Sequence, residues 1–212
     1  MVKVKSVFFC KECGNESPKW IGHCPGCGSW NSYVEESVVV GKDTKSARNV
    51  AASETKPKPV KVQDISSAKE SRLDLECDEL NRVLGGGLVP GSLILLGGEP
   101  GIGKSTLLLQ VALRLKDKKV LYVSGEESAQ QIKMRAERIG IDNDNCLILT
   151  ETNTANIIKH FEDIKPDIAI IDSIQTLESS AVDSMAGSIS QIRETAAEMN
   201  KVAKSLHVPT FL

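Results

Sequence analysis

The stretch from Gly98 to Ser105 constrains this chain more than any other. Its residues, Gly98-Glu99-Pro100-Gly101-Ile102-Gly103-Lys104-Ser105, fit the pattern of glycine, four residues and Gly-Lys-Ser/Thr at every fixed position. The apolar segment 92–96 before it predicts a short strand, and segment 106–115 after it predicts a buried helix. The glycines let successive backbone N–H groups surround a phosphate, and the helix N-terminus faces the same anion. This order indicates a nucleoside triphosphate site rather than an ordinary glycine-rich turn.

The motif also predicts the roles of individual side chains. Lys104 would reach the β- and γ-phosphates of the nucleotide, and the Ser105 hydroxyl would hold Mg²⁺. Segment 168–172 is a run of four apolar residues that ends in Asp172, which predicts a carboxylate at the magnesium edge of a parallel sheet. We expect Asp172 to hold magnesium together with Ser105. The nucleotide-binding residues expected as a set are Gly98, Glu99, Pro100, Gly101, Ile102, Gly103, Lys104, Ser105, Thr106 and Asp172.

Hydrolysis of a triphosphate would also need a carboxylate that orients and deprotonates the attacking water. Glu126 and Glu127 directly follow the apolar segment 120–124, so they should lie at the same edge of the sheet as Asp172. The residues alone do not distinguish the two glutamates from each other, or from solvated loop charges.

Four of the six cysteines form a second motif near the N-terminus. Cys10 and Cys13 are separated by two residues, ten residues follow, and Cys24 and Cys27 repeat the spacing. Two such turns predict a closed tetrahedral zinc site with a structural role. We therefore expect a four-cysteine zinc ribbon over residues 1–36, whose folding depends on the metal. Two disulfides are the alternative. Trp20, Trp30 and Tyr33 are expected to cover the ribbon, with base stacking by exposed aromatic rings as the other possibility.

Charge and composition divide the chain into parts. Residues 1–63 carry ten Lys or Arg against six Asp or Glu, whereas residues 64–212 carry sixteen against twenty-two. Any affinity for nucleic acid is thus more natural in the N-terminal part or in local patches. Residues 37–65 are rich in Ser, Thr, Ala, Lys and Pro without apolar periodicity, which predicts a flexible linker. No apolar run could span a membrane and no signal peptide is evident, so the expected compartment is the cytoplasm.

Strand and helix patterns alternate through residues 66–212. Beyond the phosphate motif, strands are expected at 120–124, 146–150, 168–172 and 208–212, and helices at 128–139, 154–164 and 188–206. Such alternation predicts an α/β fold, a parallel sheet with helices on both faces. The last segment reads as a central strand at which the chain stops, so we expect this ATPase core to be truncated on its C-terminal side.

Several strings together resemble the bacterial RadA (Sms) family of RecA-related DNA repair ATPases. They are Glu16 to Trp20, Leu84 to Ser92, Gly98 to Gln110, Tyr122 to Ser128 and Ile170 to Thr176. The resemblance covers essentially the whole chain and implies a RecA-like fold, with ATP, Mg²⁺ and Zn²⁺ as cofactors and Lys104 and Glu126 as catalytic residues. It also implies a DNA-dependent ATPase that acts on single-stranded and branched DNA by branch migration, as a homo-oligomeric ring, a hexamer, with a RecA-type recombinase as partner.

Two features depart from this resemblance. RadA-like proteins continue past the position of Leu212, into a Lys-Asn-Arg-Phe-Gly motif and a further domain. Segment 178–187 occupies the place of a DNA-facing loop in RecA-like proteins, yet it contains Glu178 and Asp183 and no basic residue. Two alternatives therefore stay open. One is a KaiC-like switch in which ATP controls assembly with protein partners, and the other is a chain that binds ATP without hydrolysing it.

Overall fold

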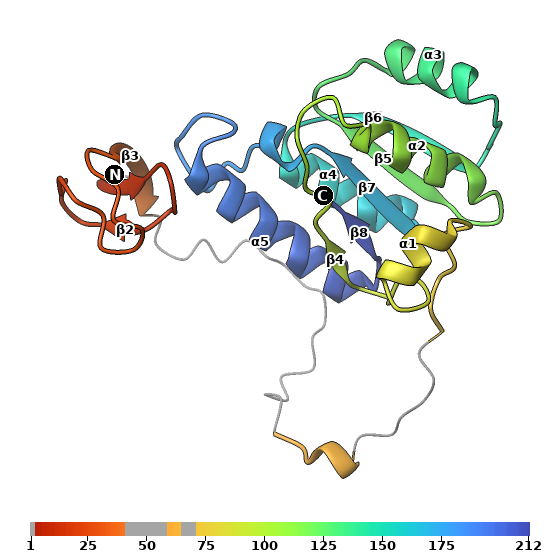
Figure 1. The fold of residues 1–212 in the computed structure, drawn as a ribbon, viewed down its shortest axis with the longest axis horizontal. Coiled ribbons are helices and arrows are strands. Elements are labelled where there is room, and N and C mark those ends of the chain that lie inside the picture. The colour runs from red at the N-terminus through yellow and green to blue at the C-terminus, as the bar shows by residue number, and fades with distance from the viewer. Residues whose placement is uncertain (1–2, 41–58, 65–70) are drawn as a thin grey trace.

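The computed structural model describes residues 3–40, 59–64 and 71–212, with the side chains of 3–6 and 36–40 left aside. The described residues form two sheets, a small one near the N-terminus and a larger one in the second part of the chain (Figure 1). No helix within these ranges is both long and apolar enough to cross a membrane.

The small sheet is antiparallel, with strand order β2-β1-β3. Its strands are β1 (Lys3–Cys10), β2 (Glu16–Ser17) and β3 (Tyr33–Val40), and β1 pairs with β3 along its whole length. Strand β3 therefore continues past residue 36, because Ser37 to Val40 pair with β1 in the ladder that begins at Tyr33. Most of the predicted linker, residues 41–58, lies outside the described residues, and Val62–Asp64 forms a short 3-10 turn, η1.

The large sheet is parallel and has the strand order β4-β8-β7-β5-β6. Its bounds are Leu93–Ile94 for β4, Val120–Ser124 for β5, Cys146–Thr150 for β6, Ile168–Asp172 for β7 and Thr210–Phe211 for β8. Strand β8 lies between β4 and β7, so the segment expected at 208–212 is an interior strand, although shorter than expected. The strand expected at 92–96 is also reduced, to β4.

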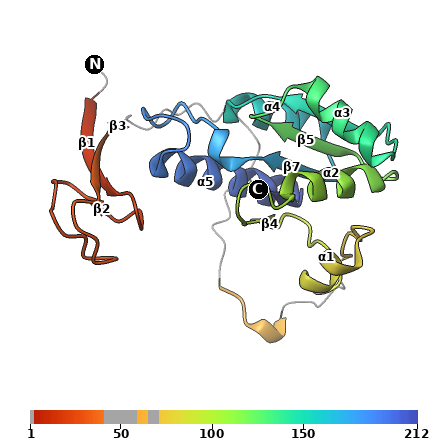
Figure 2. The same ribbon diagram turned by 45° about the horizontal axis from the view of Figure 1, so that its top comes forward.

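Helices cover both faces of this sheet (Figures 1 and 2). Their bounds are Asp78–Val83 for α1, Lys104–Arg114 for α2, Ala129–Ile139 for α3, Thr154–Ile164 for α4 and Ile189–Leu206 for α5. On one face of the sheet, an apolar core joins α2 and α3 to every second residue of β5 and β7. On the other face, a second apolar core joins α4 and α5 to the intervening residues of the same two strands. The α/β prediction is confirmed, because each buried strand supplies side chains to two cores.

Local signals set the helix starts. The Ser128 hydroxyl accepts a hydrogen bond from the Gln131 N–H, and Gln131 Oε1 accepts one from the Ser128 N–H, which fixes the start of α3. Helix α4 is capped by Asn153, whose side chain accepts hydrogen bonds from the backbone N–H groups of Ala155 and Asn156, and Thr154 is the first residue inside the helix. Capping by the earlier residue leaves Thr154 free to bond the carbonyl of Glu178.

Candidate functional site: a phosphate loop with a paired serine and aspartate, and a four-cysteine centre

The phosphate loop runs from the end of β4 to the start of α2. Gly101 and Gly103 have φ values of 80° and 101°, in the left-handed region that side chains disfavour. Gly103 is the N-cap of α2, so the free N–H groups of the first helical turn and the positive end of the helix dipole are directed at the space enclosed by the loop. Lys104 and Ser105 lie within this first turn, two residues earlier than the sequence predicted for the helix start.

Lys104 folds back over the loop. Its Nζ donates hydrogen bonds to the carbonyl oxygens of Gly98 at 2.6 Å and Glu99 at 2.9 Å. The ammonium group therefore lies at the mouth of the loop, where the β- and γ-phosphates of a nucleotide are held in proteins with this motif. Glu99, Pro100 and Ile102 are exposed, so they can contribute to binding only through the backbone or at the rim.

Ser105 and Asp172 meet although they are separated by 67 positions in the chain. The Ser105 hydroxyl donates to Asp172 Oδ1 at 3.0 Å. Asp172 is the last residue of β7, and Ser105 is in the first turn of α2, so the carboxyl end of the strand and the amino end of the helix converge. A hydroxyl and a carboxylate at this distance, beside a phosphate loop, fit the oxygen-ligand preference of Mg²⁺.

Tyr122 completes this pair and was not identified from the sequence. Its hydroxyl donates to Asp172 Oδ2 at 2.7 Å from a fully buried position in β5. Burial, followed by the nearby Asp172 carboxylate, raises the pKa of the Tyr122 hydroxyl far above its usual range. The hydroxyl therefore remains a donor and fixes the orientation of the Asp172 carboxylate. A tyrosine within an otherwise aliphatic strand was the available signal, because a buried tyrosine needs a partner for its hydroxyl.

Glu126 and Glu127 have different partners. Glu126 is exposed, and its Oε1 accepts a hydrogen bond at 2.8 Å from the hydroxyl of Ser173, the residue after Asp172. The carboxylate of Glu127 instead forms an ion pair with Arg135 of α3. Glu126 thus bonds the residue that follows Asp172 at this edge of the sheet, while the charge of Glu127 is paired with an arginine. This arrangement favours Glu126 as the residue that could act on water.

A cavity of about 550 Å³ opens beside the phosphate loop, between α2 and α3. Thr106, one residue past Ser105, contributes to its wall. The other lining residues combine an amide, an apolar side chain and charged groups: Gln110, Glu127, Arg135, Arg138 and Ile139. The structure brings Thr106 to the point where the phosphate loop meets this cavity.

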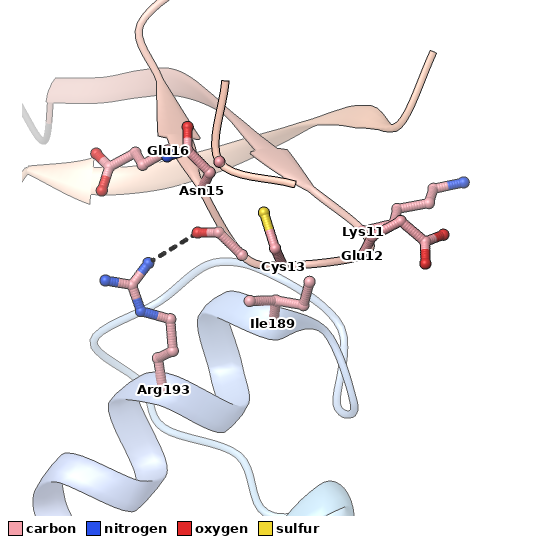
Figure 3. A pocket seen from close by; sticks show the side chains of 9 residues that line it. Lys11, Glu12, Cys13, Asn15, Glu16, Ile189 and Arg193 are labelled. Atoms are coloured by element: carbon pink, nitrogen blue, oxygen red, sulfur yellow. Dashed lines mark hydrogen bonds between the residues drawn. The ribbon is translucent and has the colours of Figure 1, made fainter. Parts of the chain in front are cut away.

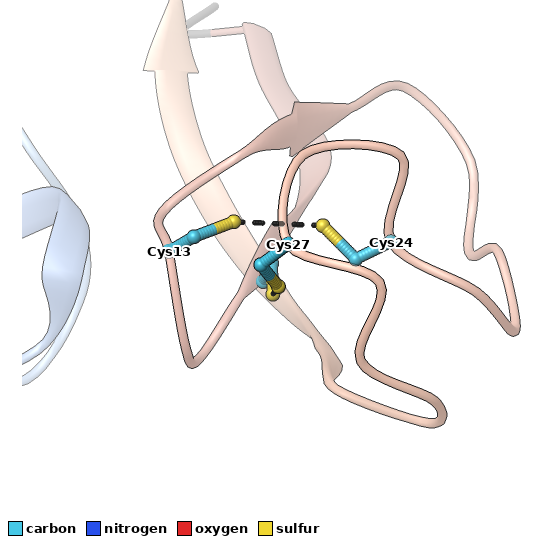
Figure 4. Close-up of side chains that lie close together, drawn as sticks. Cys13, Cys24 and Cys27 are labelled. Atoms are coloured by element: carbon cyan, nitrogen blue, oxygen red, sulfur yellow. Dashed lines mark hydrogen bonds between the residues drawn. The ribbon is translucent and has the colours of Figure 1, made fainter.

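The four cysteines of the ribbon converge on one point, and Figure 4 labels three of them, Cys13, Cys24 and Cys27. All four sulfur atoms lie within 4.8 Å of one another, with 3.6 Å between the Sγ atoms of Cys10 and Cys27 and 3.5 Å between those of Cys13 and Cys24. A tetrahedral zinc ion with bonds of about 2.3 Å holds its sulfurs about 3.8 Å apart. All six cysteines are free of disulfide bonds, so the disulfide alternative is wrong. The donor set and its spacing fit a tetrahedral metal.

The surroundings of Cys24 favour its thiolate. Burial opposes ionisation, but backbone N–H groups of Cys27 and Gly26 and the Tyr33 hydroxyl point at the sulfur and lower the pKa of Cys24 to about 6. Gly14 and Gly28 each follow a Cys-x-x-Cys turn at a positive φ, as the motif requires. A thiolate at neutral pH is the form that binds metal.

The expected aromatic cover of the ribbon is only partly correct. Tyr33 is buried with Cys10 and Cys24, but Trp20 is 53% exposed and Trp30 is 74% exposed. Trp30 contacts the ring of His23, with ring centroids 4.9 Å apart. A ribbon whose sulfurs are tied to one metal needs little apolar core, which explains why two large rings remain at its surface.

The ribbon contacts the first turns of α5 (Figure 3). Arg193 Nη1 donates a long hydrogen bond of 3.4 Å to the carbonyl of Gly14, and Ile189 lies against the same glycine. Cys13 and Asn15 line the hollow between the two elements. The contact is small, and it places the metal ribbon next to the beginning of the helix that follows segment 178–187.

Comparison with known proteins identifies the family. Residues 56–207 match the family model described as an AAA domain, and residues 8–35 match the model described as a rubredoxin metal binding domain. The chain therefore belongs to the AAA domain family, a family of ATPases, and carries a four-cysteine metal-binding ribbon before it. The expected fold class, including the ribbon, is confirmed.

Curated relatives confirm the resemblance to bacterial RadA proteins. The chain is 52% identical over 213 residues to DNA repair protein RadA of Streptococcus pyogenes serotype M6, and 47% identical over 214 residues to DNA repair protein RadA of Bacillus subtilis. Each alignment covers the whole of this chain, and 46% and 47% of the two relatives. The chain thus spans about half the length of the curated relatives it matches.

A solved structure supports the same fold. A KaiC-like protein from Pyrococcus horikoshii superposes with a TM-score of 0.54 at 21% identity, covering 67% of this chain and 69% of the other. At this identity the likeness shows the fold alone. Because the curated relatives are named as DNA repair proteins, the KaiC-like switch interpretation is not favoured.

Proposed function

We propose that this chain forms the ATP-binding core and metal ribbon of a DNA repair ATPase. The bond between Ser105 and Asp172 carries the proposal, because it joins the two predicted magnesium partners beside a fully formed phosphate loop. ATP, rather than another nucleotide, is supported by membership of the AAA domain family.

The proposed roles follow from the positions of the side chains. The N–H groups at the start of α2 and the Lys104 ammonium bind the β- and γ-phosphates, for which Lys104 exchanges its bonds to the carbonyls of Gly98 and Glu99. Ser105 and Asp172 hold Mg²⁺, which supplies charge neutralisation at the phosphates when bound. Tyr122 keeps the Asp172 carboxylate in place. The nucleoside extends past Thr106 into the cavity between α2 and α3.

Glu126 is proposed as the general base. Its carboxylate lies next to Ser173 at the magnesium edge, where it can accept a proton from a water molecule that attacks the γ-phosphate. Glu127, which is paired with Arg135, serves to hold the same loop against α3. Lys104 stabilises the charge that develops on the transferred phosphoryl group.

We further propose that the complete protein uses this hydrolysis on single-stranded and branched DNA, as a homo-oligomeric ring working with a RecA-type recombinase. The names of the curated relatives, DNA repair protein RadA, support a role in repair. The finer activity follows from the family resemblance of the motifs. We also propose zinc as the metal of Cys10, Cys13, Cys24 and Cys27, because their closed four-sulfur set suits a structural Zn²⁺.

Steady-state hydrolysis by the complete protein tests the proposal. ATP turnover is expected to rise when single-stranded DNA is added and to fall at least a hundredfold in Glu126→Gln, on the usual scale for removing a general base. Glu127→Gln is the matched control and should retain most of the turnover. If Glu127→Gln is the inactive variant and Glu126→Gln is not, the assignment of the base is wrong. An absence of any DNA effect would contradict the DNA-dependent role.

A further inference from the structure

The loop that carries Glu126 packs directly on the turn that follows Asp172. That turn is η2 (Ile174–Thr176). The N–H of Gly125 donates to the carbonyl of Asp172 at 3.2 Å, and a Cβ on Gly125 would lie 2.6 Å from Thr176 Cβ and in collision with its hydroxyl. Only a glycine lets the two segments approach this closely. The position of Glu126 is therefore tied to the position of η2.

Ser173 joins the two segments through its side chain. Its hydroxyl donates to Glu126 Oε1 at 2.8 Å, while its carbonyl accepts from the Thr176 hydroxyl at 2.8 Å and from the Thr176 N–H at 3.2 Å. Ser173 is thus fixed by the turn on one side and holds the carboxylate on the other. A hydrogen bond to an ionised group is stronger than one between neutral groups, so this contact can orient an exposed glutamate.

Beyond η2 the chain enters residues 178–188, here named the 178–188 loop. The buried amide of Gln191 holds this loop to α5: Gln191 Oε1 accepts from the Ser179 N–H at 2.9 Å, and the two N–H groups of Nε2 are shared among the carbonyls of Ser179, Val182 and Ser184 at 3.0–3.2 Å. The Ser179 hydroxyl also donates to Glu198 of α5 at 2.9 Å. These bonds hold Ser179, Val182 and Ser184 together against α5, and η2 lies just before the loop in the chain.

We propose that Ser173 is a positioning residue for Glu126 and that η2 links Glu126 to the 178–188 loop. Binding of a nucleoside triphosphate with Mg²⁺ at the phosphate loop then alters the exposure of the 178–188 loop through Ser173. The proposal rests on the function proposed above, because it requires Glu126 to act on water. If Glu126 shifts toward a nucleotide, either Ser173 moves with it or the hydrogen bond between the Ser173 hydroxyl and the Glu126 carboxylate breaks. The neighbouring Gly125 is already packed against Thr176, so the loop that carries Glu126 has no free space on that side.

Kinetics of the complete protein separate positioning from a general loss of structure. Ser173→Ala removes the donor, and kcat for ATP is expected to fall about tenfold with KM little changed, on the scale of one bond to a charged group. Ser173→Thr keeps a hydroxyl and should restore much of kcat. Ser205→Ala is the matched control, because the Ser205 hydroxyl bonds only within α5, to the Val202 carbonyl, and is far along the chain from the site.

Hydrogen exchange with ATPγS and Mg²⁺ tests the link itself. Adding ATPγS is expected to change the exchange of the 178–188 loop in the wild type and in Ser205→Ala, and to leave it unchanged in Ser173→Ala, although that variant still binds ATPγS. An equal change in Ser173→Ala, or an unaltered kcat, overturns the proposal. Failure of the wild type to bind ATPγS, or equal binding by Lys104→Ala, instead overturns the function on which it rests.

Discussion

The hydroxyl of Tyr122 should contribute measurably to the stability of the core through Asp172. Tyr122→Phe removes a buried donor that lies 2.7 Å from Asp172 Oδ2 and leaves the ring in place. A hydrogen bond to a charged group contributes about 1.5–3 kcal/mol. Because Asp172 is only partly buried and water can replace the lost donor, we expect about 1.5 kcal/mol. For a domain of 150–250 residues that unfolds as one unit, that corresponds to a fall in Tm of about 3–6 °C.

A double-mutant cycle assigns this loss to the pair. Thermal unfolding of the complete protein is measured for the wild type, Tyr122→Phe, Asp172→Asn and the double variant. We expect an interaction energy of about 1 kcal/mol or more between the two positions. Tyr33→Phe is the matched control, since it deletes the other tyrosine hydroxyl, in the ribbon, and should leave the unfolding of the core unchanged. Effects of Tyr122→Phe and Asp172→Asn that add to within about 0.3 kcal/mol would refute this account of Asp172.

Three further predictions concern pH, metal and backbone. The raised pKa of Tyr122 keeps its hydroxyl protonated in the folded protein, whereas in the unfolded chain the same hydroxyl ionises above a pH of about 10. The free energy of unfolding of the core should therefore fall by about 1.4 kcal/mol per pH unit above that point, and less steeply in Tyr122→Phe. Urea titrations at pH 9 to 11 test the difference. Removing the metal with a chelator, or making Cys24→Ser, should abolish the protection of backbone amides from hydrogen exchange in β1 and β3 and leave that of β5 and β7 intact. A metal-dependent fold would be contradicted if the ribbon stays protected when metal analysis finds no bound metal. Gly101→Ala, at φ 80° with open space around a Cβ, should cost about 1 kcal/mol of backbone strain, which lowers Tm by about 2–4 °C, and it should also weaken ATP binding. Thermal unfolding and calorimetry measure the two effects.

The parts of the site that could be predicted from the sequence are those set by local pattern. The phosphate loop, Asp172 at the end of a buried strand and the two Cys-x-x-Cys turns each follow from spacing within a few residues. The structure brings Ser105 and Asp172 to 3.0 Å and gathers the four sulfurs within 4.8 Å. These predictions needed only the rule that carboxyl ends of parallel strands share one edge.

Contacts between distant segments could not be predicted in this way. Which of Glu126 and Glu127 is available depends on where Arg135 and Ser173 come to lie, and that follows from the packing of α3 and η2. Tyr122 reaches Asp172 because β5 and β7 are neighbours in a register that only the sheet defines. The exposure of Trp20 and Trp30 was missed because four cysteine sulfurs, rather than large apolar side chains, gather at one point of the ribbon.

The loop from Gly98 to Thr106, together with Asp172, is proposed to form a site for ATP and Mg²⁺. Calorimetric titration of the complete protein with ATP tests it most directly, with and without Mg²⁺, for the wild type and Lys104→Ala. We expect magnesium-dependent binding in the wild type and at least about tenfold weaker binding in the variant, the loss of one strong charged contact. Equal affinity of the two proteins for ATP would contradict the account.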